Sequence, residues 1–219
     1  MPTVERVSEL SAIDASAFAS IYESAFPPEE RIGTESLLAD VASPATPRHG
    51  WVVRRAGHLA GLAVAVDLDD TDAVLLEYLA VDPARRSAGL GSRLLRSVCD
   101  DVRASRPGVS TIVLEVEPPA AGAGSRSEAV RRDRERRGAF YRANGAVPVD
   151  TAGAYEVPAF GAGGTLRFDL LALPLSSGGP PVAGPALHRC VAAILRASYG
   201  LPGDDPRVGA VLTRLPPAA

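Results

Sequence analysis

A loop between an apolar strand and an amphipathic helix carries the residues with the clearest chemistry. In this segment, two arginines, Arg85 and Arg86, are followed by Gly89 and Gly91. Glycine lets a backbone approach a ligand closely. The helix that follows presents its first N–H groups and the positive end of its dipole to whatever occupies the loop. The segment therefore predicts an anion site, and the arginines beside it favour a phosphate.

Two common phosphate motifs do not fit this loop. A P-loop needs Gly-Lys-Ser/Thr at the helix start, and the chain contains no lysine. A dinucleotide fingerprint needs a third glycine three residues after the second, where this chain has Leu94. The pattern that remains, Arg86-x-x-Gly89-x-Gly91, is weak by itself because 21 of the 219 residues are glycine. The strand before this pattern and the helix after it make the pattern a stronger indication of a phosphate-binding loop.

The pattern resembles the acyl-coenzyme A pyrophosphate loop of the GNAT N-acetyltransferases. Two further segments are similar to that family, Phe140–Ala146 (FYRANGA) and Ile21–Arg31 (IYESAFPPEER). The first resembles the helix that ends before a late strand, and Gly145 can adopt the left-handed conformation that stops a helix. The second is similar to the segment between the first two helices of many bacterial members. The resemblance covers roughly residues 3–175.

The resemblance implies an α+β fold of three layers (α/β/α) around a mixed sheet, with a C-terminal helical extension beyond it in this chain. In the family, two parallel strands splay apart beside the pantetheine arm of acetyl-CoA. The equivalent strands here are Ala73–Val81 and Thr111–Glu117. The residues assigned to the coenzyme are Leu79, Ala80, Val81, Arg86, Ser87, Ala88, Gly89, Leu90, Gly91, Ser92 and Asn144. A backbone N–H near Leu79–Val81 would meet the oxyanion.

Acyl transfer to an amine needs a base, because an amine with a pKa near that of lysine is protonated at neutral pH. Glu77 lies in the middle of an apolar strand, where a lone carboxylate is expected to have a raised pKa. It also matches the position of the catalytic glutamate in many members of the family. The alternatives are a glutamate on the solvent face of an edge strand and one paired with an arginine.

Glu115 and Glu117 alternate with Leu114 and Val116, so both point to one face of their strand, roughly 6–7 Å apart. Two carboxylates on one face predict an acidic pocket that suits a cationic amine. Their proximity is also expected to raise the pKa of one of them. The alternative is a solvated strand end.

The resemblance also implies residues near the coenzyme sulfur and in the wall of the acceptor pocket. Tyr141 matches the tyrosine near the coenzyme sulfur, where a phenol can protonate the leaving thiolate; alternatively, Phe140 and Tyr141 are only the last apolar turn of a charged helix. In the family, the segment after the first helix forms one wall of the acceptor pocket. The residues assigned to this wall are Tyr22, Phe26, Glu29 and Glu30, and Pro27-Pro28 would fix its turn.

Hydrophobic periodicity predicts the elements that position these residues. Helices are expected from a cap at Ser11 or Asp14 through Ser24, and over 34–43, 89–105, 128–144, 186–199 and 208–215. Strands are expected over 3–10, 51–55, 59–66, 73–81, 111–117, 146–150 and 166–173. A Gly/Pro-rich linker, 176–185, divides an acetyltransferase domain (1–175) from a C-terminal extension (186–219). The apolar stripe of this extension must pack against its own chain or a second subunit.

Composition limits the partners. The net charge is −3, which argues against a general affinity for nucleic acid or for an anionic membrane. The arginine-rich stretch 126–137 also contains acids at i,i+4 spacing, which is typical of a solvated helix with ion pairs. Two cysteines are too few for a disulfide scaffold, and no metal site is expected. Without a signal peptide or a long apolar run, we expect a cytoplasmic protein.

These features predict an acetyl-CoA-dependent N-acetyltransferase. The expected acceptor is the amine of a small cationic metabolite, which attacks the thioester directly. An alternative is a protein N-terminal or lysine acetyltransferase. An alternative of another class is a non-catalytic acyl-CoA-binding module whose C-terminal helices mediate assembly. The sequence leaves the acceptor, the acyl length and the oligomeric state open, and a homodimer is one arrangement that it allows.

Overall fold

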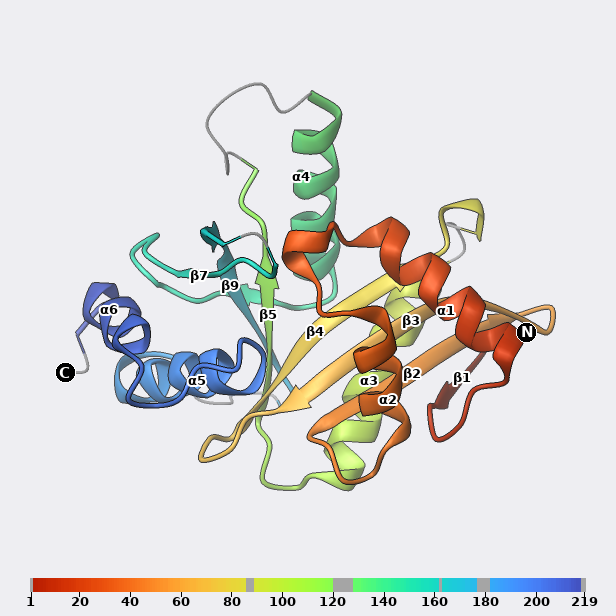
Figure 1. Cartoon of the computed structure of the whole chain (residues 1–219), viewed down its shortest axis with the longest axis horizontal. Helices are drawn as coiled ribbons and strands as arrows, with labels where there is room; N and C mark the ends of the chain where they lie inside the picture. Colours follow the sequence, from red (N-terminus) through yellow and green to blue (C-terminus); the bar gives the residue numbers. More distant parts are fainter. Residues whose placement is uncertain (1, 86–88, 120–127, 162, 177–181, 218–219) are drawn as a thin grey trace. The chain divides into compact units, whose positions relative to one another are not determined.

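The structure is a computed structural model, and it describes residues 2–85, 89–119, 128–161, 163–176 and 182–217. Its α-helices are α1 (Ala12–Ala25), α2 (Thr34–Ala42), α3 (Leu90–Ser105), α4 (Glu128–Ala143), α5 (Gly184–Ala197) and α6 (Pro206–Arg214) (Figure 1). Two short 3₁₀ helices cover Pro28–Glu30 and Pro83–Arg85. The strands are β1 (Thr3–Arg6), β2 (Arg48–Arg55), β3 (His58–Asp67), β4 (Ala73–Val81), β5 (Thr111–Val116), β6 (Val147–Pro148), β7 (Glu156–Pro158), β8 (Thr165–Arg167) and β9 (Asp169–Pro174).

A mixed sheet organises the chain. Its strand order is β1-β2-β3-β4-β5-β9-β6, and β7 pairs with β8 in a separate ribbon. The pairs β1/β2, β2/β3, β5/β9 and β6/β9 are antiparallel, whereas β4 and β5 are parallel. Parallel neighbours need a crossover connection, which α3 provides between β4 and β5. The predicted α+β fold with a mixed central sheet is therefore confirmed.

The chain forms two compact units. The first comprises residues 1–67, 76–107 and 159–163, and the second comprises residues 68–75, 108–158 and 164–219. The C-terminal helices α5 and α6 thus belong to the same unit as β5 and α4. The division of the sequence at residue 175 into a domain and an extension stays a prediction.

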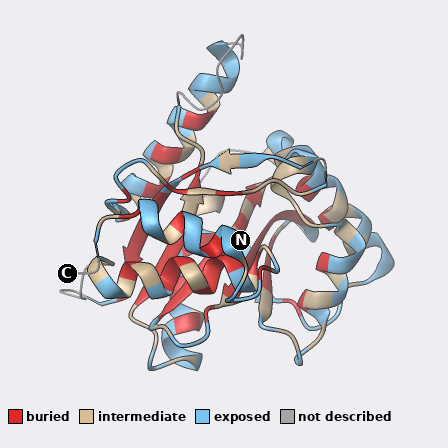
Figure 2. Cartoon of the chain, turned by 60° about the vertical axis from the view of Figure 1, so that its left-hand side comes forward, coloured by how far each residue is buried: buried red, intermediate tan, exposed pale blue. Residues whose placement is uncertain are grey.

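In the first unit, helices cover both faces of the strands. Helices α1 and α2 lie on one face, and α3 lies on the other (Figure 1). Strand β3 is consequently buried from Leu59 to Val66, whereas the helices are buried on one side only (Figure 2). Gly61 allows β3 to approach β4, because a Cβ at this position would lie 2.7 Å from the carbonyl oxygen of Ala80. This close packing holds the second half of β4 against the core.

Local sequence signals predicted the hairpin of this unit correctly. Ala56 and Gly57 connect β2 to β3, and both have positive φ values, 49° and 79°. A two-residue turn with two left-handed residues matches the twist of antiparallel strands. The first helix is also capped as predicted, since the Ser11 side chain accepts a hydrogen bond from the Asp14 N–H.

In the second unit, the predicted apolar stripe of the C-terminal segment is buried within the chain itself. Leu187, Val191, Ile194 and Leu195 on α5 are at most 1% exposed. The predicted strand over 166–173 is wrong in its extent. The chain changes sheets at Phe168, whose N–H donates to the Tyr155 carbonyl, so β8 pairs with β7 and β9 pairs with β5.

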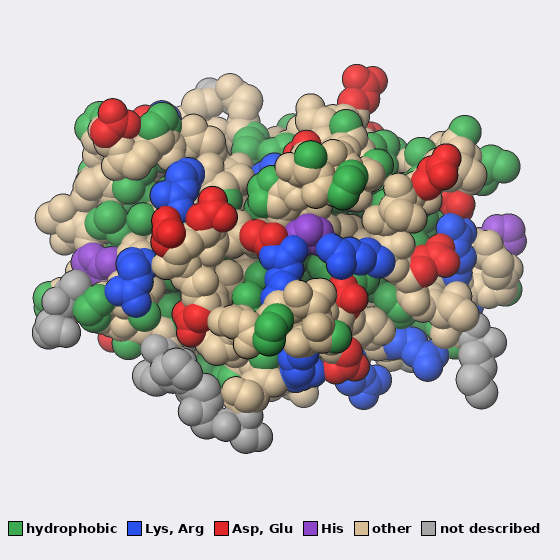
Figure 3. Space-filling view, turned by 90° about the horizontal axis from the view of Figure 1, so that it is seen from below, with side chains coloured by type: hydrophobic (Ala, Val, Ile, Leu, Met, Phe, Trp, Pro, Cys, Tyr) green, Lys and Arg blue, Asp and Glu red, His purple; other side chains and the backbone are tan. Residues whose placement is uncertain are grey.

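Charged side chains lie mostly in ion pairs. On α4, Arg131 pairs with Glu135 and Arg132 pairs with Glu128, each at 2.5 Å, as the i,i+4 spacing predicted. The face shown in Figure 3 carries interspersed acidic and basic side chains and no block of one sign. Cys99 and Cys190 are buried free thiols. Among the described residues, no helix is both long and apolar enough to cross a membrane.

Candidate functional site

The start of α3 has the conformation that the anion loop requires. Gly89 is its N-cap, in the left-handed region with φ +70°, and its carbonyl accepts the first hydrogen bond of the helix from the Arg93 N–H at 2.9 Å. The N–H groups of Leu90, Gly91 and Ser92 precede that bond and lie at the positive end of the helix dipole. Arg86, Ser87 and Ala88 lie outside the described residues. The assignment of this loop to the coenzyme stays a prediction that the described geometry suits.

The turn before the loop is organised by Asp82. The Asp82 N–H donates to the Ala60 carbonyl at 3.0 Å, and its carboxylate accepts a hydrogen bond from the Ala84 N–H at 2.9 Å. The same carboxylate pairs with Arg85 at 3.3 Å, so Arg85 adds less free charge to the loop than predicted. A cavity of about 310 Å³ opens beside this turn and is bounded on its other sides by α1 and the β2–β3 turn.

The second half of β4 presents alternate residues to its two sides. Ala80 is buried and packs in the core beneath α1 and α2, whereas Leu79 and Val81 are half-buried. This alternation follows from the period of two in a strand. The predicted contact of Leu79, Ala80 and Val81 with the coenzyme, and of a backbone N–H among them with the oxyanion, stays a prediction.

Glu77 is not the lone carboxylate that the sequence predicted. Its buried side chain receives two hydrogen bonds from Arg48, from Nε to Oε2 at 2.9 Å and from Nη2 to Oε1 at 3.1 Å. Arg48 also pairs with Asp40 at 3.0 Å. Burial lowers the pKa of Arg48, but the charges of Glu77 and Asp40 outweigh it, and the net shift is upward. The alternative interpretation, that Glu77 is paired with an arginine, is therefore correct.

The ion pair makes Glu77 a stabilising residue in its own right. We expect Glu77→Gln to lower the free energy of unfolding by about 3 kcal/mol, because Arg48 stays buried after losing one of its two carboxylates. The matched control is Glu5→Gln, which removes one of the carboxylate partners of Arg54 at an exposed site and leaves Asp14 in place, and it should cost about 1 kcal/mol or less. Urea unfolding of both variants measures the difference. Equal losses of stability would contradict the prediction.

Glu115 is held by two tyrosines. The Tyr155 hydroxyl donates to Oε1 at 2.5 Å, and the Tyr199 hydroxyl donates to Oε2 at 3.0 Å. Tyr155 is fully buried, and burial together with the negative charge of Glu115 raises its pKa well above the usual value, which keeps it a proton donor. Sequence reasoning missed both tyrosines, because they lie 40 and 84 residues from Glu115 and no short motif links them.

Glu117 has a different environment from Glu115. It pairs with Arg134, which is only 4% exposed, and with Arg137 at 3.5 Å, and both arginines belong to α4. Leu114 and Val116 are buried, as the predicted alternation requires. Glu115 lies on β5 and Glu117 lies directly after its end, so the expected strand is one residue shorter, and the contacts of the two glutamates do not form one shared acidic pocket. Glu117 pairs with the guanidinium groups of Arg134 and Arg137, whereas Glu115 accepts hydrogen bonds from the phenols of Tyr155 and Tyr199.

Tyr141 and Asn144 lie at the end of α4. Tyr141 is buried, and burial, opposed by the charge of Arg137, raises the pKa of its phenol to about 12. The Asn144 side chain donates to the Phe140 carbonyl at 2.8 Å, and Gly145 has a φ of +95°. The predicted helix stop is confirmed. The acid role of Tyr141 and the coenzyme contact of Asn144 stay predictions.

The predicted acceptor wall divides into core and surface residues. Tyr22 is fully buried, contacts the rings of Phe26 and Tyr78, and donates its hydroxyl to the Ile32 carbonyl at 3.2 Å. Tyr22 is therefore a core residue, and its assignment to the acceptor stays a prediction. Phe26 is half-buried on the same cluster.

Glu29 and Glu30 are half-buried on the 3₁₀ turn that Pro28 begins. The Glu29 carbonyl accepts a hydrogen bond from the Phe160 N–H at 2.9 Å. A segment 130 residues further along the chain therefore holds this turn in place, which no local sequence signal indicated. The assignment of Phe26, Glu29 and Glu30 to the acceptor stays a prediction.

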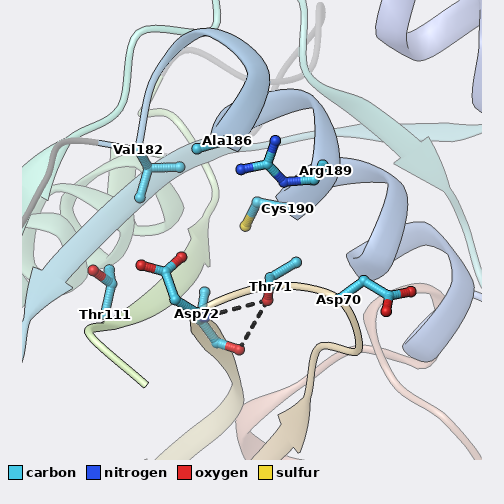
Figure 4. A pocket seen from close by; sticks show the side chains of 9 residues that line it. Asp70, Thr71, Asp72, Thr111, Val182, Ala186, Arg189 and Cys190 are labelled. Atoms are coloured by element: carbon cyan, nitrogen blue, oxygen red, sulfur yellow. Dashed lines mark hydrogen bonds between the residues drawn. The ribbon is translucent and has the colours of Figure 1, made fainter. Parts of the chain in front are cut away.

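A cavity of about 370 Å³ lies in the second unit, between residues 70–73, the start of β5 and the first half of α5 (Figure 4). Two of its polar side chains bond to groups outside the lining, since the Asp72 carboxylate accepts from Ser110 Oγ at 2.6 Å and Thr71 Oγ1 donates to the Leu68 carbonyl at 2.8 Å. Arg189 and Cys190 close the other side. Of the described residues, none assigned to the coenzyme or the acceptor lines this cavity.

Comparison with known proteins agrees with this geometry. The sequence model of the acetyltransferase (GNAT) family matches residues 15–124. None of the curated proteins compared with the chain matches it.

Solved structures of low sequence identity share the fold. A protein described as a GNAT-family acetyltransferase from Bacteroides thetaiotaomicron is 21% identical with a TM-score of 0.69, and the match covers 91% of this chain and 99% of that one. An aminoglycoside 6′-N-acetyltransferase complexed with coenzyme A is 18% identical (TM-score 0.60; 81% and 99% covered). The ribosomal-protein-S18-alanine N-acetyltransferase from Escherichia coli is 23% identical (TM-score 0.53; 82% and 97% covered).

Proposed function

The chain belongs to the acetyltransferase (GNAT) family, and from this premise we propose that it acetylates the amine of a small cationic metabolite. Acetyl-CoA is the donor that this family uses. The neutral amine nitrogen attacks the thioester carbonyl, a C–N bond forms, and the C–S bond breaks to release coenzyme A as its thiolate. The amine must lose one proton, and the thiolate must gain one.

The hydrogen-bonded carboxylate of Glu115 is the observation that carries this proposal. Two phenol hydroxyls order the carboxylate without themselves carrying positive charge. An ionised, oriented carboxylate attracts an ammonium group and can accept its proton, directly or through water. Glu77 and Glu117 pair with arginines. Because the phenols of Tyr155 and Tyr199 orient the carboxylate of Glu115, we assign the acceptor amine to Glu115 and a supporting role to the other two.

Tyr141 is the proposed donor to the leaving thiolate. Because the pKa of this phenol is raised to about 12, it keeps its proton throughout the neutral range. In the same proposal, the residues at the start of α3 bind the pyrophosphate through their backbone N–H groups.

The acceptor class is the part of the proposal that the fold leaves open. One similar structure is an aminoglycoside N-acetyltransferase, and another modifies an alanine of a ribosomal protein. The charge at Glu115 favours the small cationic amine over a neutral or acidic acceptor. The test distinguishes this proposal from two alternatives, an enzyme that acetylates a peptide and a non-catalytic acyl-CoA-binding module.

A matched pair of amines tests the acceptor class. With acetyl-CoA as donor, we expect 1,5-diaminopentane to show a kcat/KM about 10 to 100 times that of pentylamine. The second ammonium group gives it an extra charge-assisted hydrogen bond while one nitrogen reacts. Release of free thiol measures both reactions, and Glu115→Gln, which removes the proposed base, should lower kcat for both amines.

Three results would contradict the proposal. These are equal kcat/KM values for the two amines, a preference for a peptide with a free N-terminus, and binding of acetyl-CoA without transfer to any amine of a wider panel of cationic acceptors.

A further inference from the structure

The C-terminal segment reaches the carboxylate on which the proposed acceptor chemistry depends. Tyr199 follows α5, whose last residue is Ala197, and its hydroxyl lies 3.0 Å from Glu115 Oε2. Tyr155 reaches the other oxygen from the segment before β7, at 2.5 Å. Two segments that are distant in the sequence therefore donate to the two oxygens of one side chain.

The end of α5 fixes the position of Tyr199. The Ser198 N–H donates to the Ile194 carbonyl at 2.9 Å, and the Leu201 N–H donates to the Leu195 carbonyl at 3.0 Å. Gly200 lies between them with a φ of +64°. A left-handed glycine with a bond from the residue after it back to the last turn is a helix-stop motif. This motif fixes the backbone on both sides of Tyr199.

Burial on both sides of Glu115 supports a fixed arrangement. Tyr155 has no exposed surface, and Ile194 and Leu195 anchor the last turn of α5 in the core. Cys190 lies one to two turns earlier on the same helix. Burial first, then the charges of Asp72 and Glu115, raise the pKa of its thiol to about 12, so this thiol stays neutral beside the carboxylate.

We infer that Tyr199 is a positioning residue for acetyl transfer, and that α5 is part of the acceptor apparatus because it presents Tyr199 to Glu115. The inference rests on the proposed role of Glu115. Tyr199 and Tyr155 act as a pair that keeps the carboxylate ionised and holds it in one rotamer. Tyr199 touches neither donor nor acceptor in this scheme and acts through Glu115.

The pair has a predictable effect on the protonation of Glu115. Hydrogen bonds donated to a carboxylate stabilise its charged form and lower its pKa. Removing one donor worth about 1 kcal/mol should therefore raise the pKa by about 0.5 to 1 pH unit. Carboxyl ¹³C NMR of glutamate-labelled protein measures this midpoint without any acceptor, and the Glu115→Gln variant assigns the resonance.

The experiment compares Tyr199→Phe and Tyr155→Phe with the control Ser198→Ala. Ser198 is buried next to Tyr199, and its hydroxyl has no hydrogen-bond partner among the described residues. We expect both tyrosine variants to raise the Glu115 midpoint by about 0.5 to 1 pH unit, and the control to leave it unchanged. With 1,5-diaminopentane and acetyl-CoA, Tyr199→Phe should raise the KM for the amine several-fold and leave the KM for acetyl-CoA unchanged.

An unchanged Glu115 midpoint in Tyr199→Phe would overturn the inference, even if the variant were less stable, because a purely structural tyrosine would move stability alone. If the midpoint shifts but neither amine is acetylated, the positioning contact exists and the proposed acceptor is wrong. The two failures are therefore distinguishable. A shift of the midpoint accompanied by an equal rise in both KM values would also contradict the assignment to the acceptor side.

Discussion

Replacing Gly89 and Gly91 together by valine should reduce the affinity for acetyl-CoA at least 100-fold while the protein remains folded. Gly89 has a φ of +70°, which a β-branched residue adopts at a substantial cost, and it precedes the N–H groups that are proposed to bind pyrophosphate. Loss of two hydrogen bonds to a charged group, each worth about 1.5 to 3 kcal/mol, gives a reduction of this size. Isothermal titration calorimetry with acetyl-CoA measures it.

Two further variants separate the effect of backbone strain at Gly89 from the effect of added side-chain bulk. A Cβ at Gly89 meets nothing within 4 Å, so Gly89→Ala tests the strained conformation with little added bulk and should have a smaller effect. Gly203→Val is the control, because Gly203 also faces open space but lies between α5 and α6 with an ordinary φ. Unchanged affinity in the double valine variant would remove the coenzyme from this loop.

Tyr141→Phe should lower kcat by about 100-fold and leave the affinity for acetyl-CoA nearly unchanged. The ring is buried, so phenylalanine keeps its packing and removes only the hydroxyl that is proposed to protonate the thiolate. Because the phenol pKa is raised to about 12, the wild-type rate should show no limb from Tyr141 between pH 6 and 10. Stopped-flow or steady-state thiol release, with calorimetry for the coenzyme, measures both parameters.

Tyr78→Phe is the matched control for this experiment. Its hydroxyl is also buried, but it accepts a hydrogen bond from the Ile32 N–H at 3.3 Å and so serves the core. We expect Tyr78→Phe to lower stability by about 1 kcal/mol and to change kcat little. A kcat loss in Tyr141→Phe no larger than that in Tyr78→Phe would show that the proton comes from another group.

Local signals in the sequence predicted much of the fold. The Ala56-Gly57 turn, the cap at Ser11 and the stop at Asn144-Gly145 all depend on residues within one turn of each other. Backbone conformation and hydrogen bonding between near neighbours decide such features, so the residues themselves reveal them. The strand at 166–173 was predicted as one element because its apolar run is continuous. Only pairing with different partners, β7 on one side of Phe168 and β5 on the other, divides it.

The sequence by itself predicted an anion loop at a helix start, and it correctly placed Glu77 and Glu115 on strands, whereas Glu117 lies directly after the second strand ends. Only the tertiary structure decided the surroundings of these acids. Arg48 lies 29 residues from Glu77, and Tyr199 lies 84 residues from Glu115. The alternation of residues along a strand predicts which face a carboxylate occupies. The charges around that carboxylate depend on which side chains the folded chain brings to the same face. The folded chain brings arginines to Glu77 and Glu117, and it brings Tyr155 and Tyr199 to Glu115.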